Sequence, residues 1–431
     1  MSGSFGSVKN YLDSFVCNGN NVIYFKLIRD IKSIEDDEVD KEFTFQPEFC
    51  HQLFGQSENI FGYKNLRINL YYSACKLVRF ISITYSDKVD REKSQGVPAD
   101  DVLQIITEKL GGTVLTSIDQ FSQELAHDTD FKPYGTQLDC FKLKKKASKS
   151  SSNSAPTSSS LTSSQNAENS ESCFEIYRAD MDIPGFESYH ENMQTFLTWF
   201  IDAASYIDTE DRKWDYYLVY EKCPDIKNGS DSPVFYFAGY ATVYRYYAYP
   251  DKTRPRISQF LILPPFQRRG IGERLLQNIY HTYAGDTNII DITVEDPSEE
   301  FTRLRDYVDC KNCAHLMSFQ TTELKKGWND DMVKEAQEKF KLAKKQIRRV
   351  YEILKYKSIN KYDEEQMRNF RLEVKNRLNA PSLKMKRSNL SEDEESSVLG
   401  NKETRLQELN LLYCQLEDDY KQVINKLTSV A

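Results

Sequence analysis

The sequence predicts an α+β protein whose centre is a strand, a glycine-bearing loop, a helix and a second strand. Three observations predict this class. The apolar run 260–263 is followed at once by two prolines, the loop 267–272 and a helical repeat. Short apolar runs typical of strands recur throughout residues 21–247. Beyond residue 328, apolar residues follow the 3.6-residue spacing of amphipathic helices.

The expected elements follow one another in an order that hydrophobic spacing and turn residues define. Alternating or continuous apolar runs predict strands at 21–27, 66–72, 78–85, 215–220, 234–247, 258–263 and 288–294. Apolar residues at helical spacing predict helices at 100–110, 193–206, 273–280, 328–358 and 402–427. Gly111 and Gly112 are expected to end the first of these helices, and Pro264 and Pro265 to end strand 258–263.

Changes in composition divide the chain into four segments. Residues 1–146 are expected to form an N-terminal α+β domain, and residues 173–325 a second domain of helices and strands. Between them, residues 147–172 form a serine-rich linker, which we expect to be disordered because it has too few apolar residues to offset its ordering entropy. Residues 326–431 are expected to be helical, with a disordered acidic segment at 380–402.

Bulk composition indicates a globular chain and limits its partners. A length of 431 residues suggests two or three domains. The net charge of −8 argues against a nucleic-acid-binding protein, whose affinity depends on neutralising phosphates, and favours a cationic substrate. The sequence has neither an N-terminal signal segment nor an apolar run long enough to span a membrane. We therefore expect a cytoplasmic and nuclear protein that contacts neither membrane nor nucleic acid directly.

The nine cysteines do not predict a disulfide framework, because they are scattered and odd in number. Cys310 and Cys313, with His315 nearby, form a lone C-x-x-C pair. A zinc site is one interpretation, but two ordinary helical cysteines fit a single pair better. We therefore expect no metal.

The loop 267–272, with the sequence Q-R-R-G-I-G, has the features of a phosphate-binding turn. Amide groups at a helix start lack intrahelical partners and carry partial positive charge, so they attract a pyrophosphate. Gly270 and Gly272 have no Cβ, which lets phosphate oxygens approach the backbone. The spacing is shorter than the dinucleotide G-x-G-x-x-G and lacks the lysine of a P-loop. A glycine turn that merely opens a helix is the alternative.

The order of strand, Q-x-x-G-x-G loop, helix, strand and acid resembles the core of the acetyl-CoA-dependent N-acetyltransferases, the GNAT fold. Further blocks make the chain similar to one family, the catalytic subunit of the type B histone acetyltransferases. These blocks lie at 54–64, 199–208, 249–256, 292–298, 304–306 and 348–354. The resemblance implies a GNAT acyl-CoA N-acyltransferase fold, with the N-terminal α+β domain and the C-terminal helices as additions.

The resemblance also implies a function. The enzyme would transfer acetyl from its co-substrate acetyl-CoA to lysines in the N-terminal tail of newly synthesised histone H4, in a ternary complex. A WD40-repeat histone-binding subunit is the implied partner. Two alternatives stay open: an acetyltransferase for another amine, and a non-catalytic histone-binding scaffold. The block 249–256 argues against the first, and an intact Glu295 argues against the second.

The resemblance places acetyl-CoA along the predicted strand and loop. Main-chain groups of Phe260, Leu261 and Ile262 would pair with the pantetheine arm, and Ser298 and Tyr307 would also touch the cofactor. The pyrophosphate would lie on Gln267, Arg268, Arg269, Gly270, Ile271, Gly272 and Glu273. Two of these loop residues are arginines where relatives often carry glycine, and we expect both arginine side chains to be solvated.

A carboxylate is needed because a lysine ammonium must lose a proton before it can attack. With an amine pKa near 10.4, that loss costs about 4–5 kcal/mol at neutral pH. The resemblance assigns the general base to Glu295, at the end of strand 288–294. The alternative is that Glu295 and Asp296 only cap or salt-bridge a turn before Pro297. Asp296 and Asp202 would assist, and the short side chain of Asp202 favours electrostatic attraction of the lysine over proton transfer.

Aromatic and acidic residues would bind the histone tail. The resemblance places Trp214, Tyr244, Arg245 and Tyr246 along the histone groove, where aromatic rings would cover the aliphatic stem of lysine. Alternate tyrosines on a strand could instead belong to the core. Glu58 stands where relatives place an acidic contact to the tail.

Overall fold

The computed structural model describes the chain except residues 1–9, 37, 93, 95, 145–170, 226–229, 390–401, 430 and 431. The chain divides into two compact units. The first unit comprises residues 1–244 and 258–275, and the second comprises residues 245–257 and 276–431. Most of the serine-rich linker and of the acidic segment therefore lie outside the described residues.

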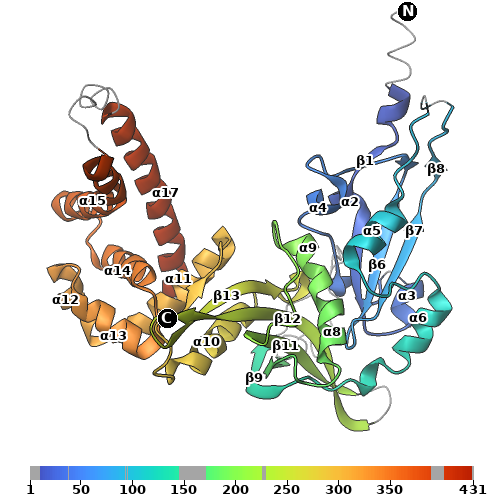
Figure 1. The fold of residues 1–431 in the computed structure, drawn as a ribbon, viewed down its shortest axis with the longest axis horizontal. Coiled ribbons are helices and arrows are strands. Elements are labelled where there is room, and N and C mark those ends of the chain that lie inside the picture. Colours follow the sequence, from blue (N-terminus) through green and yellow to red (C-terminus); the bar gives the residue numbers. More distant parts are fainter. Residues whose placement is uncertain are drawn as a thin grey trace, which may run out of the picture. The chain divides into compact units, whose positions relative to one another are not determined.

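A four-stranded sheet in the order β3-β2-β6-β7 organises the start of the first unit, and Figure 1 labels its strands β6 and β7. Its strands are β3 (Thr44–Phe45), β2 (Ile23–Ile28), β6 (Arg67–Ser73) and β7 (Arg79–Thr84). Strands β2 and β6 are parallel, and β6 and β7 are antiparallel. Two small two-stranded sheets accompany it. In one, β1 (Val16–Asn18) pairs with β4 (Asn59–Phe61), and in the other, β5 (Tyr63–Lys64) pairs with β8 (Asp87–Lys88).

Helix α5 of this region confirms the helix expected at 100–110, whereas helix α6 was not predicted. Helix α5 (Val102–Leu110) buries Val102, Ile106 and Leu110, which lie on one face, and its cap Asp101 accepts a hydrogen bond from the Gln104 amide. It ends at Gly111, whose φ of +64° suits glycine. Helix α6 (Ile118–Leu125) packs its Phe121 into a core cluster with Ile28, Tyr71 and Phe80.

The structure also contains a six-stranded sheet in the order β14-β13-β12-β11-β10-β9. Its strands are β9 (Thr136–Lys144), β10 (Glu171–Ala179), β11 (Trp214–Asp225), β12 (Ser230–Ala248), β13 (Lys252–Ile262) and β14 (Thr293–Val294). Strands β9 to β12 pair antiparallel, whereas β13 and β14 are parallel. Glu171 and Ser172, expected at the end of the linker, already belong to β10 because they pair with Lys144 and Leu143.

The amphipathic segment 193–206 is not one helix. It is divided among α8 (Phe186–Met193), η3 (Gln194–Phe196) and α9 (Leu197–Phe200), and the chain then leaves the helix at Ile201. The rings of this segment lie against the four-stranded sheet, where Phe25 contacts Phe196, Trp199 and Phe200 at centroid distances of 5.4–6.2 Å. Much of the high aromatic content thus forms this core.

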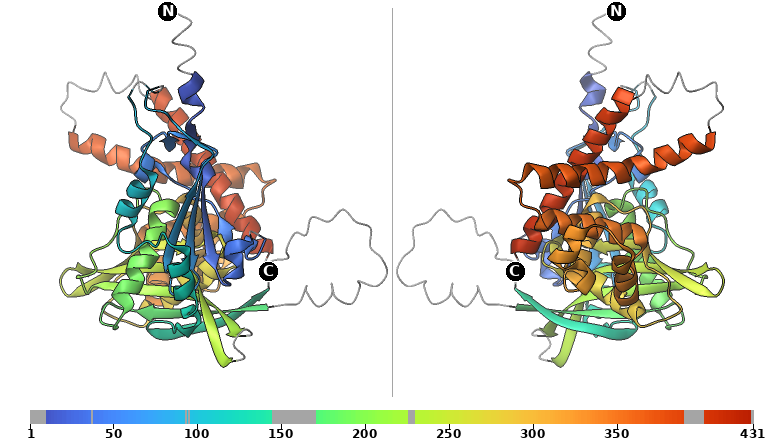
Figure 2. Two further views of the ribbon diagram at one scale, coloured as in Figure 1. Left: turned by 90° about the vertical axis from the view of Figure 1, so that its right-hand side faces the viewer. Right: turned by 90° about the vertical axis from the view of Figure 1, so that its left-hand side faces the viewer.

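The region after the sheet is helical, as expected. It contains α10 (Ile271–Ala284), α11 (Glu299–Cys313), α12 (Thr321–Lys326), α13 (Asp330–Phe340), α14 (Lys344–Ser358), α15 (Glu364–Asn389) and α17 (Lys402–Ser429). Helix α17 packs against α11, α14 and α15, which Figure 2 shows from two further sides. No described helix is both long and apolar enough to cross a membrane.

Three expectations for this region were wrong in part. The helix expected at 328–358 is broken at Lys341, whose φ of +54° ends α13. Only Thr293 and Val294 of the expected strand 288–294 form a strand. The segment expected to be disordered from residue 380 is helical as far as Asn389, because the residues after Pro381 are mostly good helix formers.

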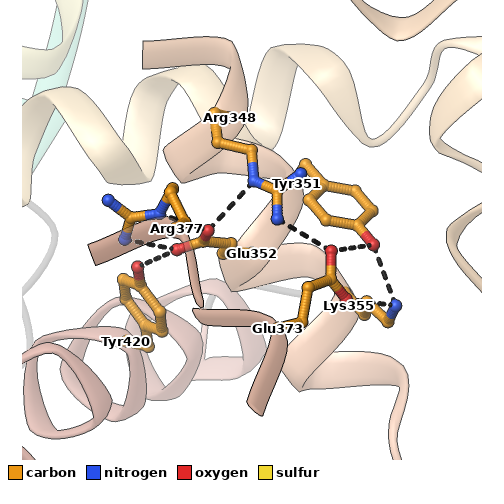
Figure 3. Close-up of polar contacts among 7 residues, drawn as sticks. All are labelled: Arg348, Tyr351, Glu352, Lys355, Glu373, Arg377 and Tyr420. Atoms are coloured by element: carbon orange, nitrogen blue, oxygen red, sulfur yellow. Dashed lines mark hydrogen bonds and ion pairs between the residues drawn. The ribbon is translucent and has the colours of Figure 1, made fainter. Parts of the chain in front are cut away.

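A buried glutamate joins three helices of the second unit (Figure 3). The Glu352 carboxylate of α14 lies 3.0 Å from Arg348 Nε and 2.6 Å from Arg377 Nε of α15. It also accepts a 2.7 Å hydrogen bond from the Tyr420 hydroxyl of α17. The Glu352 side chain is fully buried. Beside it, Glu373 is partly exposed and contacts Arg348 and Lys355, each at 2.8 Å.

We predict that Glu352→Ala lowers the free energy of unfolding by about 3–5 kcal/mol, because it leaves two partly buried guanidinium groups without their shared carboxylate. Urea unfolding followed by circular dichroism measures the change. The matched control is Glu373→Ala, which removes a more exposed carboxylate from the same cluster. Equal losses in the two variants would contradict the role of Glu352 as the junction.

A second buried acid, Asp309, is expected to make the free energy of unfolding depend on pH. Asp309 of α11 accepts a 2.9 Å hydrogen bond from Gln346, and its Oδ1 has no hydrogen-bond partner among the described residues. Burial raises the pKa of Asp309 to about 7, whereas an unfolded aspartate titrates near pH 4. The folded state therefore binds more protons between about pH 4 and 7, so stability falls as pH rises through this window.

We predict that Asp309→Asn flattens this dependence and stabilises the protein more at pH 8 than at pH 5. Urea unfolding at the two pH values measures it. If the free energy of unfolding changed equally between pH 5 and pH 8 in the variant and the wild type, Asp309 would not titrate as its burial predicts.

Candidate active site

The loop 267–273 is shaped to receive an anion at the start of α10. Gln267 Nε2 donates a 2.9 Å hydrogen bond to the Ile262 carbonyl, which holds the loop against the end of β13. Arg268 and Gly270 have positive φ, +61° and +91°, whereas Gln267 and Arg269 do not, so the sign of φ alternates along the turn. A Cβ at Gly270 would meet no atom within 4 Å. The open backbone at a helix start fits the pyrophosphate of acetyl-CoA.

The two loop arginines differ in their environment. Arg268 is exposed, as expected. Arg269, also expected to be solvated, instead lies over the Phe174 ring at 4.9 Å, and its Nε and Nη2 are buried without a hydrogen-bond partner among the described residues. Burial lowers the pKa of Arg269. The expectation was wrong because a ring on a distant strand supplies a cation–π contact that the local sequence does not reveal.

Strand β13 leads into this loop. Leu261 and Ile262 are buried and Phe260 is half-buried. Opposite them, Gly239 of β12 is required, because a Cβ there would lie 2.4 Å from the Leu261 carbonyl oxygen. The expected pantetheine contacts of these three residues are main-chain contacts, which their side chains do not determine.

Glu295 and Asp296 follow β14 directly. The parallel register pairs Arg256 with Thr293 and Ile257 with Val294, and the Glu295 amide then donates a 2.9 Å hydrogen bond to the Ile257 carbonyl. This bond fixes the Glu295 backbone, while both acidic residues are exposed. Helix α11 is capped by Ser298, whose Oγ accepts a 3.1 Å hydrogen bond from Phe301, so neither acid is its N-cap.

The two other expected cofactor contacts have different surroundings. Ser298 is exposed but already serves as the cap of α11. Tyr307 is only 2% exposed, and Lys426 of α17 lies 4.2 Å from its ring centroid. The burial of Tyr307 beneath α17 gives no support to a cofactor contact by this ring.

Asp202 lies in the loop 201–205, which other parts of the first unit hold in place. The Glu48 and Phe49 amides donate to the Trp199 carbonyl at 3.0 and 3.1 Å, just before the loop. The Gln52 carboxamide spans Ala203 and Ala204 with contacts of 3.0–3.2 Å. Gln259 of β13 donates a 3.0 Å hydrogen bond to the Ser205 carbonyl at the other end.

A histidine that the sequence analysis did not single out lies between two predicted site acids. His51 Nε2 is 3.2 Å from Asp202 Oδ1, and His51 Nδ1 is 3.9 Å from Glu58 Oε1. Glu58 also accepts hydrogen bonds from the Cys50 amide at 2.7 Å and from Asn20 Nδ2 at 2.5 Å. The only signal for His51 in the sequence was its place just before the block 54–64.

An aromatic pair with an acidic partner lies on strands β11 and β12. Trp214 and Tyr244 are register partners with ring centroids 4.8 Å apart, and the Tyr244 hydroxyl donates a 2.6 Å hydrogen bond to Asp211. Farther along β12, Arg245 is half-buried and Tyr246 is 38% exposed beneath the Arg256 guanidinium. Neither tyrosine is a core residue, which removes the alternative that the sequence left open.

The predicted site residues are divided between the units. The loop 267–273, the end of β13, Glu58, Asp202, Trp214 and Tyr244 belong to the first unit. Arg245, Tyr246, Glu295, Asp296, Ser298 and Tyr307 belong to the second.

The C-x-x-C pair of the sequence lies on helix α11. The described residues contain no group of three or more His, Cys, Asp or Glu side chains placed to hold a metal. Cys310 and Cys313 lie buried on α11, and burial raises the pKa of both thiols well above the usual range. They fit the interpretation as ordinary helical cysteines.

Comparison with known proteins assigns the parts of the chain. Residues 15–202 match the family model "Histone acetyl transferase HAT1 N-terminus", and residues 174–304 match the "Acetyltransferase (GNAT) family". Residues 305–356 match "Histone acetyltransferase type B catalytic subunit, C-terminal". The predicted GNAT fold with its N-terminal addition and C-terminal helices is confirmed, and with it an acetyltransferase that uses acetyl-CoA as co-substrate.

Curated relatives extend the match over nearly the whole chain. The human histone acetyltransferase type B catalytic subunit is 41% identical over 429 residues, which cover 98% of this chain and 96% of that protein. The rat protein of the same name is 40% identical with the same coverage. The protein of that name from Mycosarcoma maydis is 34% identical over 78% of this chain and 75% of its own length. The chain belongs to the family of histone acetyltransferase type B catalytic subunits.

Proposed function

We propose that this histone acetyltransferase modifies lysines in the N-terminal tail of newly synthesised histone H4, by direct attack in a ternary complex with Glu295 as general base. The observation that carries the proposal is the placement of Glu295. Its amide is fixed to the Ile257 carbonyl at the end of β14, while its side chain is exposed. A base on a rigid strand end keeps a constant position, as proton transfer requires.

The chemistry needs a neutral amine. Acetyl-CoA supplies an acyl thioester when bound. The lysine ammonium loses one proton to the Glu295 carboxylate, and the neutral nitrogen then forms a bond to the acyl carbon. The bond from the acyl carbon to the CoA sulfur breaks, and the leaving sulfur takes up the second proton that the nitrogen loses as it becomes an amide. Asp296 follows Glu295 in the chain and adds negative charge that attracts the ammonium form of the substrate.

Direct attack by the amine, without a cysteine intermediate, is supported by the state of the buried thiols. Burial raises the pKa of Cys50 to about 12 and that of Cys75 well above its ordinary value. A thiol that resists ionisation is a poor nucleophile. These cysteines are therefore unsuited to accept the acetyl group.

Recognition of a basic tail is supported by charge and by the aromatic pair. The Trp214 and Tyr244 rings offer apolar surface for a lysine stem, and Asp211 lies within hydrogen-bonding distance of Tyr244. The net charge of −8 favours a cationic partner over an acidic one.

The proposal extends to assembly and location. The relatives are named as subunits, which favours a complex, and we propose a WD40-repeat histone-binding chain as the partner. The proposal places the enzyme in both the cytoplasm and the nucleus. Co-purification from the two fractions tests this part.

We predict strong labelling of an H4 tail peptide from labelled acetyl-CoA, and a fall in kcat of at least about 100-fold in Glu295→Gln, because that variant loses the base. The matched control is Glu300→Gln, which changes another exposed acid that pairs with Arg303. Polyamines and a lysine-free peptide are run in parallel.

Three outcomes of that assay would count against the proposal. Labelling of polyamines but not of the peptide would favour an acetyltransferase for another amine. Peptide binding without turnover in the wild type would favour a histone-binding scaffold. Full activity in Glu295→Gln would remove the assigned base.

We also predict that Gly270→Ala raises the KM for acetyl-CoA about tenfold and leaves the KM for the peptide unchanged. The new Cβ would occupy the open backbone where the pyrophosphate approaches, at a φ that alanine tolerates poorly. Gly327→Ala is the matched control, because Gly327 has a φ of +109° and equally open surroundings at the end of α12. Similar KM changes in both variants would point to backbone strain instead of lost phosphate contact.

A further inference from the structure

The residues 48–52 of the N-terminal region reach the loop that carries Asp202. The Glu48 and Phe49 amides share the Trp199 carbonyl, His51 contacts Asp202, and the Gln52 carboxamide contacts Ala203 and Ala204. Residues 48–52 thus contact residues 199–204 in the same order along the chain. Among these contacts, the one from His51 reaches a side chain of the loop, the ones from Gln52 reach its backbone, and the Trp199 carbonyl lies just before it.

The His51 contact restricts a carboxylate that is largely exposed. The Asp202 side chain is 70% exposed, whereas the His51 side chain is 20% exposed and its ring packs edge-on against Phe49 at 5.8 Å. The fixed ring is 3.2 Å from Asp202 Oδ1 through Nε2. This contact holds the carboxylate through one of its two oxygens.

The second ring nitrogen of His51 faces Glu58. The distance of 3.9 Å to Glu58 Oε1 is too long for a hydrogen bond. The Cys50 amide and Asn20 Nδ2 hold Glu58 in place. The ring is therefore packed between a firmly held acid and an exposed one, and its direct effect falls on the exposed one.

We propose that His51 is a positioning residue for the acetyl-transfer reaction: it orients the Asp202 carboxylate, which attracts the cationic side chains of the substrate tail. This inference rests on the proposed function, since it assigns Asp202 to binding of a basic peptide. The N-terminal region then contributes to substrate binding by holding the loop 201–205.

Steady-state kinetics of the full chain with the H4 tail peptide and acetyl-CoA test the inference. We expect His51→Leu to raise the KM for the peptide about two- to fivefold, the range for an exposed ion pair, with the KM for acetyl-CoA unchanged. His51→Gln should stay within about twofold of wild type, because its amide nitrogen lies as many bonds from the backbone as Nε2 and can still donate.

A double-mutant cycle separates positioning from a general structural effect. In an Asp202→Asn background, which removes the carboxylate charge, His51→Leu should cause no further rise in the peptide KM. The control is His127→Leu, because His127 pairs with Asp130 at 3.5 Å in an exposed site of the same unit. Thermal unfolding of every variant shows whether the fold is retained.

Two results would overturn the inference alone. These are an unchanged peptide KM in His51→Leu, and an equal rise in the wild-type and Asp202→Asn backgrounds, which would assign the effect to packing of the ring. Failure of the wild-type enzyme to label the peptide would overturn the proposed function and this inference together. The wild-type measurement therefore distinguishes the two failures.

Discussion

The hydrogen bonds of strand β13 are a constraint on the proposed base, on the loop that carries Asp202 and on the loop 267–273, each within its own unit. The Ile257 carbonyl fixes the Glu295 amide, Gln259 holds the end of the Asp202 loop through Ser205, and the Ile262 carbonyl receives the Gln267 side chain. Within the first unit, β13 thus holds the loop that carries Asp202 and the loop 267–273; within the second unit, its residue Ile257 holds the proposed base. The strand itself needs Gly239 opposite Leu261, since any Cβ there would collide with the Leu261 carbonyl.

The additions to the GNAT core act on different parts of the chain. Residues 48–52 of the N-terminal region hold the loop 201–205 by backbone contacts and by His51. The C-terminal helices are joined to one another through Glu352 and cover Tyr307 of α11. The first addition therefore bears on the proposed substrate acid, whereas the second stabilises the helical region.

Local signals in the sequence predicted the elements that local interactions determine. Helix α5 and its end at Gly111, the loop 267–272 and the start of α10 follow from periodicity and glycine placement. The features that sequence reasoning missed depend on residues far apart in the chain. Helix α9 ends at Phe200, next to the carbonyl of Trp199 that the Glu48 and Phe49 amides share. The Arg269 guanidinium lies over the ring of Phe174. His51 becomes visible as a site residue only when Asp202 is placed beside it.

Direct acetyl transfer is the central claim, and a single-turnover measurement tests it most directly. Enzyme, labelled acetyl-CoA and H4 tail peptide would be mixed rapidly and quenched before the first turnover is complete. The account predicts that label appears on the peptide at the rate at which CoA is released, with none attached to the enzyme. Label that first accumulates on a cysteine of the enzyme and then moves to the peptide would contradict direct attack by the lysine.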